Sequence, residues 1–279
     1  MNIPWKIKSL IFRCVDLFDT PSFLYFLQKY VTKRTQVGTL HVSPIWKVHK
    51  DYLQKYNATA NVFEFGAGKS LAQNLYLSEI VKRQTVVDLN PMIDLGLVEK
   101  VRCQLSKVVD LPSTEKINTL EALNSYGVVY KSPYNAERTD FDDRSINACI
   151  STNTLEHIPK ESILSIFSEL NRILKDDGII SARIDYSDHY SHTDKNITML
   201  NYLKFNDETW NKYNHNCHFQ NRLRHYDYLA IFKETGFAVI DEELFYEEQN
   251  IPPKVLEAFK GKDDAWMATS AHIVLKKLD

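Results

Sequence analysis

Short apolar runs alternate with amphipathic stretches along most of this chain. The run Val62–Phe65 leads directly into glycines, which indicates a buried strand followed by a tight turn. Further strands are expected at 85–88, 127–130, 145–151, 179–186, 237–246 and 271–277. Strands that alternate with helices predict an open α/β sheet, mostly parallel, with helices on both faces.

Helical spacing of apolar residues predicts the elements between and before the strands. After the first strand, the expected helices are 71–81, 91–105, 114–126, 159–175, 226–235 and a short one near 253–260. Before it, three helices are expected: 3–18, 20–34 and 43–56. Asp177 and Gly178 are expected to end the helix at 159–175 in a turn.

Residues 187–224 interrupt the alternation after the fifth expected strand. A stretch of this length without clear periodicity is uncommon inside a compact domain unless it has a function. Five histidines lie in or beside it, at 189, 192, 215, 218 and 225. We therefore expect a helical cap over 1–57 and one domain over 58–279, with a functional insertion at 187–224.

The net charge argues against one class of partner. A formal net charge of −2 gives no electrostatic case for binding nucleic acid. Residues 1–55, however, carry nine Lys and Arg against three Asp and Glu. The basic amphipathic pattern at 3–18 is compatible with a helix that lies on an anionic membrane surface. We favour the alternative, in which this helix packs on its own domain.

The sequence predicts a cytoplasmic protein, with peripheral contact to the inner face of the membrane through residues 3–18 as an open alternative. No run of 18 apolar residues predicts a spanning helix. Arg13 and Asp16 interrupt the first apolar run, so no secretory signal is expected. The four cysteines have no paired spacing and are typical of reduced thiols. Nothing in the pattern indicates an oligomeric state.

The glycine turn at 66–68 is the first candidate for chemistry, because such a turn before a helix can hold a ligand against backbone N–H groups. A Walker phosphate loop would need a glycine where the chain has Phe63. A dinucleotide fingerprint would need a third glycine in place of Leu71. Two interpretations remain: a ligand site with the acid Glu64 two residues before the turn, or a purely structural turn.

Several segments together resemble the class I S-adenosylmethionine-dependent methyltransferases, in the type 11, Leu-Glu-His branch. They are the acid and glycine turn at 64–68, Asp88 placed 20 residues after Gly68, the loop 134–137, the Leu-Glu-His segment at 155–158, and 169–178. The resemblance covers residues 58–279. It implies a Rossmann-like fold with seven strands, the last antiparallel, and N-terminal helices that cover the cofactor or shape the acceptor site. Asp176-Asp177-Gly178 stands where Pro-Gly-Gly is usual, and Asn147 stands where Asp is commoner.

The same resemblance implies S-adenosylmethionine as the cofactor. Glu64 would help to hold its amino-acid end, and Asp88 its ribose, because a carboxylate can accept both hydroxyl protons. Leu89 would flank the adenine, and Asn135 would accept from the adenine amino group where the family usually has Asp. The expected cofactor-binding residues are Glu64, Gly66, Ala67, Gly68, Asp88, Leu89, Asn135, Ala136 and Ser151.

The implied activity is methyl transfer, and the polar, His- and Tyr-rich insertion favours a sugar hydroxyl of a glycan or related intermediate as acceptor. Methylation of another small metabolite and a non-catalytic scaffold that binds S-adenosylmethionine are the alternatives. The expected contacts of the acceptor are Tyr190, Arg222 and His157.

His189 is the first candidate for the base that takes the hydroxyl proton, oriented by Asp185 or Asp188, and His192 is the second. Asp188 and His189 could instead only brace the insertion. These four side chains also offer mixed oxygen and nitrogen ligands for a metal ion. Their spacing is not diagnostic, so no metal is predicted.

Overall fold

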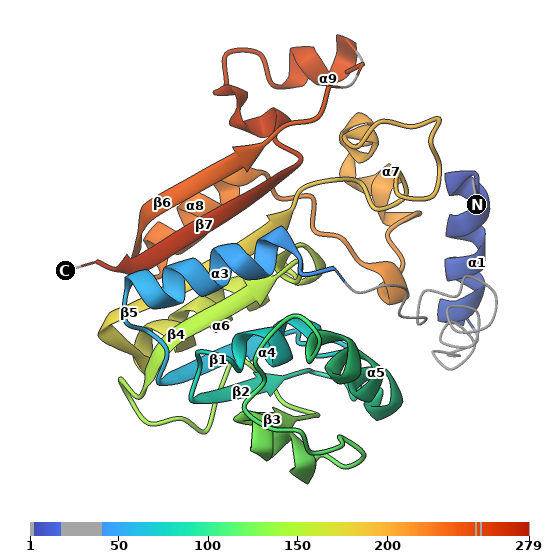
Figure 1. Cartoon of the computed structure of the whole chain (residues 1–279). Coiled ribbons are helices and arrows are strands. Elements are labelled where there is room, and N and C mark those ends of the chain that lie inside the picture. The colour runs from blue at the N-terminus through green and yellow to red at the C-terminus, as the bar shows by residue number, and fades with distance from the viewer. Residues whose placement is uncertain (1–2, 18–40, 249, 252, 279) are drawn as a thin grey trace.

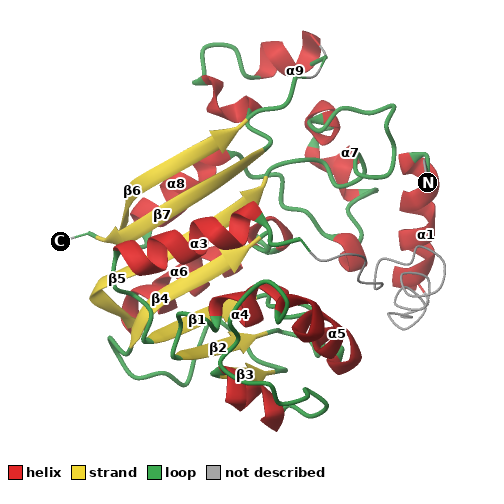
Figure 2. Ribbon diagram, in the orientation of Figure 1, coloured by secondary structure: helices red, strands yellow, loops and turns green. Residues whose placement is uncertain are grey.

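The computed structural model describes residues 3–17, 41–248, 250–251 and 253–278. Within these residues, seven strands form one sheet in the order β3-β2-β1-β4-β5-β7-β6 (Figure 2). The strands are β1 Asn61–Phe65, β2 Arg83–Val87, β3 Val128–Lys131, β4 Ile146–Thr152, β5 Leu174–Asp185, β6 Phe237–Phe245 and β7 Ser270–Lys277. Pairing is parallel from β3 to β5, and β7 runs antiparallel to both of its neighbours. The predicted α/β sheet with an antiparallel last strand is confirmed.

Helices cover both faces of the sheet (Figure 1). One face carries α3 Pro44–Lys55, α4 Ala72–Leu77 and α5 Leu95–Leu105, and the other carries α6 Lys160–Ile173 and α8 His225–Glu234. Outside these layers lie α1 Trp5–Leu17, α7 Asp207–Asn211 and α9 Pro253–Ala258. Short 3-10 segments lie at Glu121–Tyr126, Leu155–His157, Asn201–Lys204, Asn216–His218 and Asp264–Met267. The sheet therefore separates two apolar cores, one on each face.

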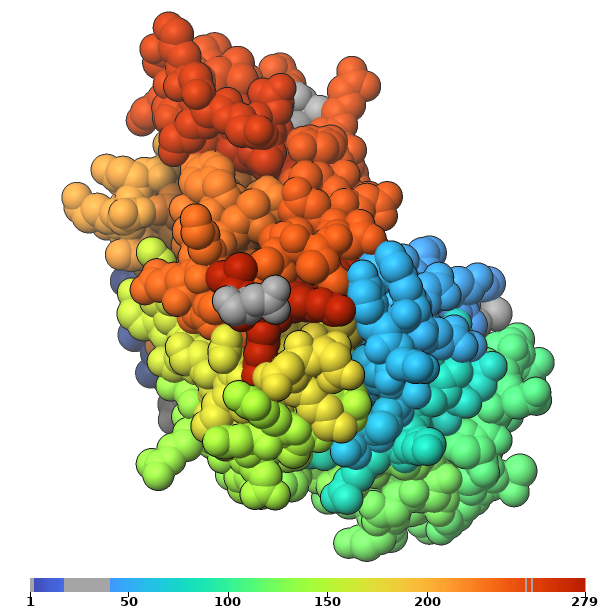
Figure 3. Space-filling model, turned by 90° about the vertical axis from the view of Figure 1, so that its left-hand side faces the viewer, coloured from blue at the N-terminus to red at the C-terminus, as the bar shows by residue number. Residues whose placement is uncertain are grey.

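Helix α3 begins where the sequence predicts it. Ser43 caps it by accepting a hydrogen bond from the N–H of Ile45 at 3.3 Å, and Pro44 takes the first turn, where no N–H is needed. The helix lies across the last strands, with the ring of Tyr52 stacked on His272 at 5.7 Å between centroids. Figure 3 shows the blue atoms of α3 beside the orange and red atoms of these strands. Helix α3 thus covers the part of the sheet that the later strands form.

Three predicted elements differ from the structure. The helix expected at 71–81 is reduced to α4, which ends at Leu77. The helix expected at 114–126 is reduced to the 3-10 turn Glu121–Tyr126. The turn expected at Asp177 and Gly178 is wrong, because both residues lie inside β5, where an irregular register against β4 absorbs them. The helix predicted at 20–34 lies outside the described residues.

Helix α1 packs against the insertion. The ring of Trp5 lies 4.8 Å from Tyr213 and 5.7 Å from Tyr190, centroid to centroid. The opposite side of the helix leaves Ile7 and Leu10 more than half exposed, at 53% and 59%. Membrane contact through this helix stays a prediction. In the described part of the chain, every helix is too short or too polar to cross a membrane.

Candidate active site

The glycine turn after β1 is tied to the end of β2 by hydrogen bonds. Gly66 and Gly68 both have positive φ, at 77° and 71°, which side chains disfavour. The N–H of Gly68 donates to Oδ1 of Asp88 at 3.2 Å, and the hydroxyl of Tyr130 donates to Oδ2 at 2.9 Å. One oxygen of Asp88 is therefore held by the turn and the other by β3. Burial raises the pKa of this carboxyl, while both hydrogen bonds oppose the rise.

A cavity of about 330 Å³ opens where β1, β2 and β4 end, and mainly apolar side chains line it. We call it the apolar cavity. Five of the nine expected cofactor residues line it: Gly66, Asp88, Leu89, Asn135 and Ala136. The expected cofactor residues did not include the apolar walls Tyr134, Met92 and Ile158, although Tyr134 and Ile158 lie in two of the family-like segments. The Oδ1 atom of Asn135 accepts from the N–H of Glu137 at 2.9 Å, so this amide is already engaged within its loop.

The other four expected residues, Glu64, Ala67, Gly68 and Ser151, are not among those that line the apolar cavity. Glu64 is buried, and its carboxylate accepts from Gln73 at 3.1 Å and Asn74 at 2.7 Å, both on α4. Desolvation raises its pKa to about 7. The expected contact between Glu64 and the cofactor's amino-acid end has no support in this geometry, because the side chain holds α4 instead. Ser151 is fully buried within β4.

The sheet order and this cavity agree with the comparison to known families. Residues 63–182 match a family model described as a methyltransferase domain. The chain carries a class I S-adenosylmethionine-dependent methyltransferase domain. S-adenosylmethionine is its cofactor.

Solved structures that are similar to this chain are distant from it in sequence. An S-adenosylmethionine-dependent methyltransferase from Clostridium acetobutylicum has a TM-score of 0.51 and 11% identity, over 92% of this chain and 98% of that one. One from Methanosarcina mazei has a TM-score of 0.47 and 15% identity, over 86% and 99%. A third structure is geranyl diphosphate C-methyltransferase from Streptomyces coelicolor, in complex with Mg²⁺, geranyl diphosphate and S-adenosylhomocysteine. It has a TM-score of 0.49 and 11% identity, over 83% of this chain and 78% of that one. No curated protein sequence matches the chain.

The methyltransferase brings three predicted residues together just after β5. Nε2 of His189 lies 3.3 Å, and Nε2 of His192 3.7 Å, from Oδ2 of Asp185. The N–H of Ser187 donates to Oδ1 of Asp185 at 2.8 Å. Burial alone would raise the pKa of Asp185, but His189 and Ser187 lower it more, to about 2. The carboxylate next to the candidate base is therefore ionised.

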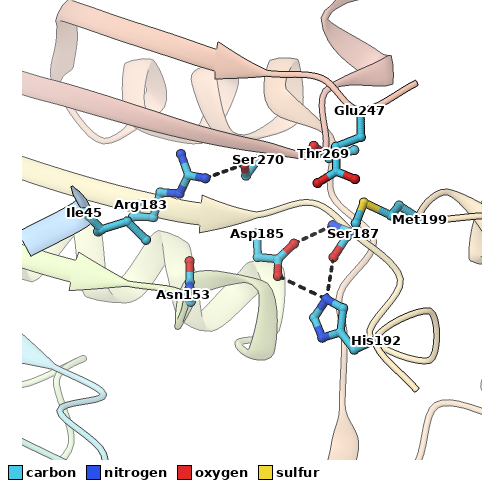
Figure 4. A pocket seen from close by; sticks show the side chains of 10 residues that line it. All are labelled: Ile45, Asn153, Arg183, Asp185, Ser187, His192, Met199, Glu247, Thr269 and Ser270. Atoms are coloured by element: carbon cyan, nitrogen blue, oxygen red, sulfur yellow. Dashed lines mark hydrogen bonds and ion pairs between the residues drawn. The ribbon is translucent and has the colours of Figure 1, made fainter. Parts of the chain in front are cut away.

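Three imidazoles connect two cavities. His157 lines the apolar cavity, and its ring lies 4.8 Å from His189, centroid to centroid. His189 stacks on His192 at the same separation, and His192 lines a second cavity of about 160 Å³. We call this the polar cavity. Its wall includes Asn153, Arg183, Asp185, Ser187, Glu247, Thr269 and Ser270 (Figure 4).

Three predicted functional residues have structural positions instead. Asp188 is fully buried and accepts from Asn201 at 3.0 Å and from the N–H of Tyr190 at 2.8 Å, so Asp185 is the carboxylate beside His189. Tyr190 is 1% exposed, and its hydroxyl donates to a backbone carbonyl. Arg222 donates to two backbone carbonyls and to Asp207. Neither side chain lines the cavities described above, so contact of Tyr190 or Arg222 with an acceptor has no support in this geometry and stays a prediction.

Arg224 is a large, buried side chain whose structural role the sequence did not predict. The residue is 2% exposed, and its guanidinium donates to the carbonyls of Tyr186 and Trp266 and to the hydroxyl of Tyr202. These contacts join the insertion to the end of β5 and to the segment before β7. An arginine between Leu223 and His225 gives no sequence signal of such burial.

Proposed function

We propose that this methyltransferase transfers its methyl group to a hydroxyl of a small polar acceptor, with a sugar unit of a glycan or related intermediate as the preferred class. The observation that carries the proposal is the polar cavity, whose wall residue His192 is joined through His189 to His157 in the wall of the apolar cavity. S-adenosylmethionine would occupy the apolar cavity, with Asp88 on the ribose. An acceptor in the polar cavity would then approach the methyl group past these imidazoles.

The lining of the polar cavity supports a polyhydroxylated acceptor. A sugar ring presents hydroxyls that both donate and accept, and this wall supplies groups of both kinds. The guanidinium of Arg183 donates to Ser270 at 2.6 Å and lies 4.2 Å from the ring of Phe245. It is thereby held in place as a donor at the cavity wall. We therefore assign to Arg183 the acceptor contact that the sequence predicted for Arg222.

The reaction is a displacement at the methyl carbon. The hydroxyl oxygen forms a new C–O bond with its lone pair, while the C–S bond breaks and its electron pair stays on sulfur. S-adenosylmethionine becomes S-adenosylhomocysteine, and the hydroxyl proton must leave. In-line alignment across the two cavities would supply much of the rate. His189 beside Asp185 is the predicted proton acceptor, and a cation held by the same side chains is the second way to weaken the O–H bond.

The test combines an acceptor screen with a cellular measurement. Purified protein with isotope-labelled S-adenosylmethionine should methylate at least one member of a panel of monosaccharides, nucleotide sugars and short glycans. Mass spectrometry of glycans from cells with and without the gene should show the loss of one methyl group. Methylation of non-sugar metabolites alone would favour the second substrate class. Binding of cofactor with no methylation of any acceptor would favour the scaffold.

A further inference from the structure

Two triads of metal-ligand type meet at His189. Asp185, His189 and His192 place one ligand atom each within 4.8 Å of one another, and Glu156, His157 and His189 do the same. The first triad faces the polar cavity, and the second includes the wall of the apolar cavity. The cluster therefore lies where the methyl donor and the acceptor are proposed to meet.

The spacing of the first triad suits a bound cation. Two ligands bonded to one ion at about 2.1 Å, with tetrahedral or octahedral angles, lie about 3.0–3.4 Å apart. The 3.3 Å and 3.7 Å that separate Oδ2 of Asp185 from the two Nε2 atoms are close to this value. Nε2 of His189 is buried and makes no hydrogen bond within the described residues. Its contact with Oδ2 of Asp185 at 3.3 Å is an ion-pair distance without hydrogen-bond geometry, so this nitrogen is available as a ligand.

The tautomer of His157 is fixed by its surroundings. Its Nδ1 lies 2.7 Å from the carbonyl oxygen of Phe219, and a carbonyl can only accept, so Nδ1 carries the proton. The lone pair is then on Nε2. Metal-binding histidines are commonly oriented in this way, by a hydrogen bond from the other ring nitrogen.

The burial of Glu156 without a hydrogen-bond partner is a second, independent observation that points to a cation. The side chain is 2% exposed, and neither carboxylate oxygen has a hydrogen-bond partner among the described residues. A buried carboxylate in that condition is costly unless a proton or a cation neutralises it. Its ligand atom lies within 4.8 Å of those of His157 and His189. The guanidinium of Arg183 attracts this carboxylate by charge but makes no hydrogen bond with either of its oxygens; the side-chain bond that it makes is with Ser270.

We propose that this cluster binds one divalent first-row transition-metal ion through Asp185, His189 and His192, with His157 and Glu156 next to the ion on the cofactor side. Mixed imidazole and carboxylate ligands suit Zn²⁺, Mn²⁺ or Fe²⁺, and three protein ligands leave positions open for an acceptor. The assignment of those positions to the acceptor hydroxyl rests on the proposed function, whereas binding of the ion does not.

With the ion bound, His189 is a ligand and no longer takes the proton. The ion polarises the coordinated hydroxyl, which loses its proton to solvent water, and the resulting oxygen anion attacks the methyl carbon. The C–O bond forms as the C–S bond breaks, and sulfur keeps the electron pair. The ion is neither oxidised nor reduced.

The test measures binding of the metal alone to the full chain. Protein stripped with a chelator is titrated with Mn²⁺, followed by paramagnetic resonance of the free ion, and with Zn²⁺ by calorimetry. We expect one ion per chain for the wild type, and at least a 100-fold weaker affinity for Asp185→Asn and His189→Gln. His41→Gln, which removes an exposed histidine outside the cluster, should bind as the wild type does.

Melting curves of the stripped proteins check that each variant is folded, and Glu156→Gln provides a near-isosteric variant should another unfold. No binding of either ion at millimolar concentration overturns the site. Binding that Asp185→Asn, His189→Gln and Glu156→Gln leave unchanged also overturns it. Methylation of an acceptor by ion-free protein would overturn the metal's role while the proposed function stands. Ion binding without methylation of any hydroxyl would contradict the proposed function and leave the site intact.

Discussion

The N–H of Gly68 donates a hydrogen bond to Oδ1 of Asp88 at 3.2 Å, and this contact joins two motifs that lie 20 residues apart. It fixes the acid at the end of β2 against the glycine turn at the end of β1. The hydroxyl of Tyr130 completes the arrangement from β3. Three neighbouring strands thus determine where the carboxylate points, before any ligand arrives.

Asp88→Ala should weaken S-adenosylmethionine binding by about 10- to 100-fold, since a hydrogen bond to a charged group is worth about 1.5–3 kcal/mol. Tyr130→Phe keeps the carboxylate and removes only one donor to it, so it should weaken binding by less than about tenfold. Calorimetry with purified protein measures both. Equal losses in the two variants would mean that Asp88 acts through the fold and not through the cofactor.

The two glycines of the turn should differ in their tolerance of a methyl group. Both have positive φ, so Ala at either position costs about 1–2 kcal/mol of stability. A Cβ on Gly66 would also lie 2.4 Å from Cγ2 of Thr154, whereas one on Gly68 meets no atom within 4 Å. Gly66→Ala should therefore lower the urea midpoint clearly more than Gly68→Ala. Similar midpoints would show that Thr154 moves aside at little cost.

Local patterns predicted the sheet because most of its strands contain an apolar run bounded by turn residues. The acids and glycines at the strand ends were predicted for the same reason, since the carboxyl ends of parallel strands meet at one edge. The insertion offered no such rule. Its tyrosines and Arg222 are typical of a sugar site in composition, but the fold uses Tyr190 and Arg222 for packing and for binding backbone carbonyls.

A buried chain of polar side chains also escaped prediction, because its members come from distant elements. Thr152 donates to Gln73, and His49 lies 3.0 Å from the same hydroxyl through Nε2. The Nδ1 atom of His49 pairs with Ser181 at 2.8 Å. Burial lowers the pKa of His49 well below its usual value, so the ring is neutral. Gln73 continues the chain to Glu64.

Glu64 should give the methyltransferase a specific pH dependence of stability. Burial raises its pKa from 4.5 to about 7, so between these values the folded state holds a proton that the unfolded state has lost. The free energy of unfolding therefore falls as pH rises through this window, by at most about 3 kcal/mol. Glu64→Gln removes this pH-dependent contribution to the free energy of unfolding. The stability of the variant relative to wild type should rise from pH 4.5 to 7 and then level off.

Urea unfolding of both proteins from pH 5 to 8 measures this difference. Taking the difference also cancels the buried histidines, whose lowered pKa values act in the opposite direction over part of the same range. A difference that stays constant with pH would show that Glu64 is ionised in the folded protein. Its partners Gln73 and Asn74 would then stabilise the charge more than burial opposes it.

Helix α1 should control the order of the turn that carries His189. Lys8 is 9% exposed, and its ammonium donates to the carbonyl of His189 at 3.0 Å. Lys8→Met keeps the apolar stem and removes this bond, which should lower the local opening free energy by about 1–2 kcal/mol and speed amide exchange over 188–194 by about tenfold. Lys6→Met, on an exposed position of the same helix, should leave exchange there unchanged. Mass spectrometry measures the exchange. Equal exchange in the two variants would mean that aromatic packing alone, and not Lys8, holds the helix and the turn together.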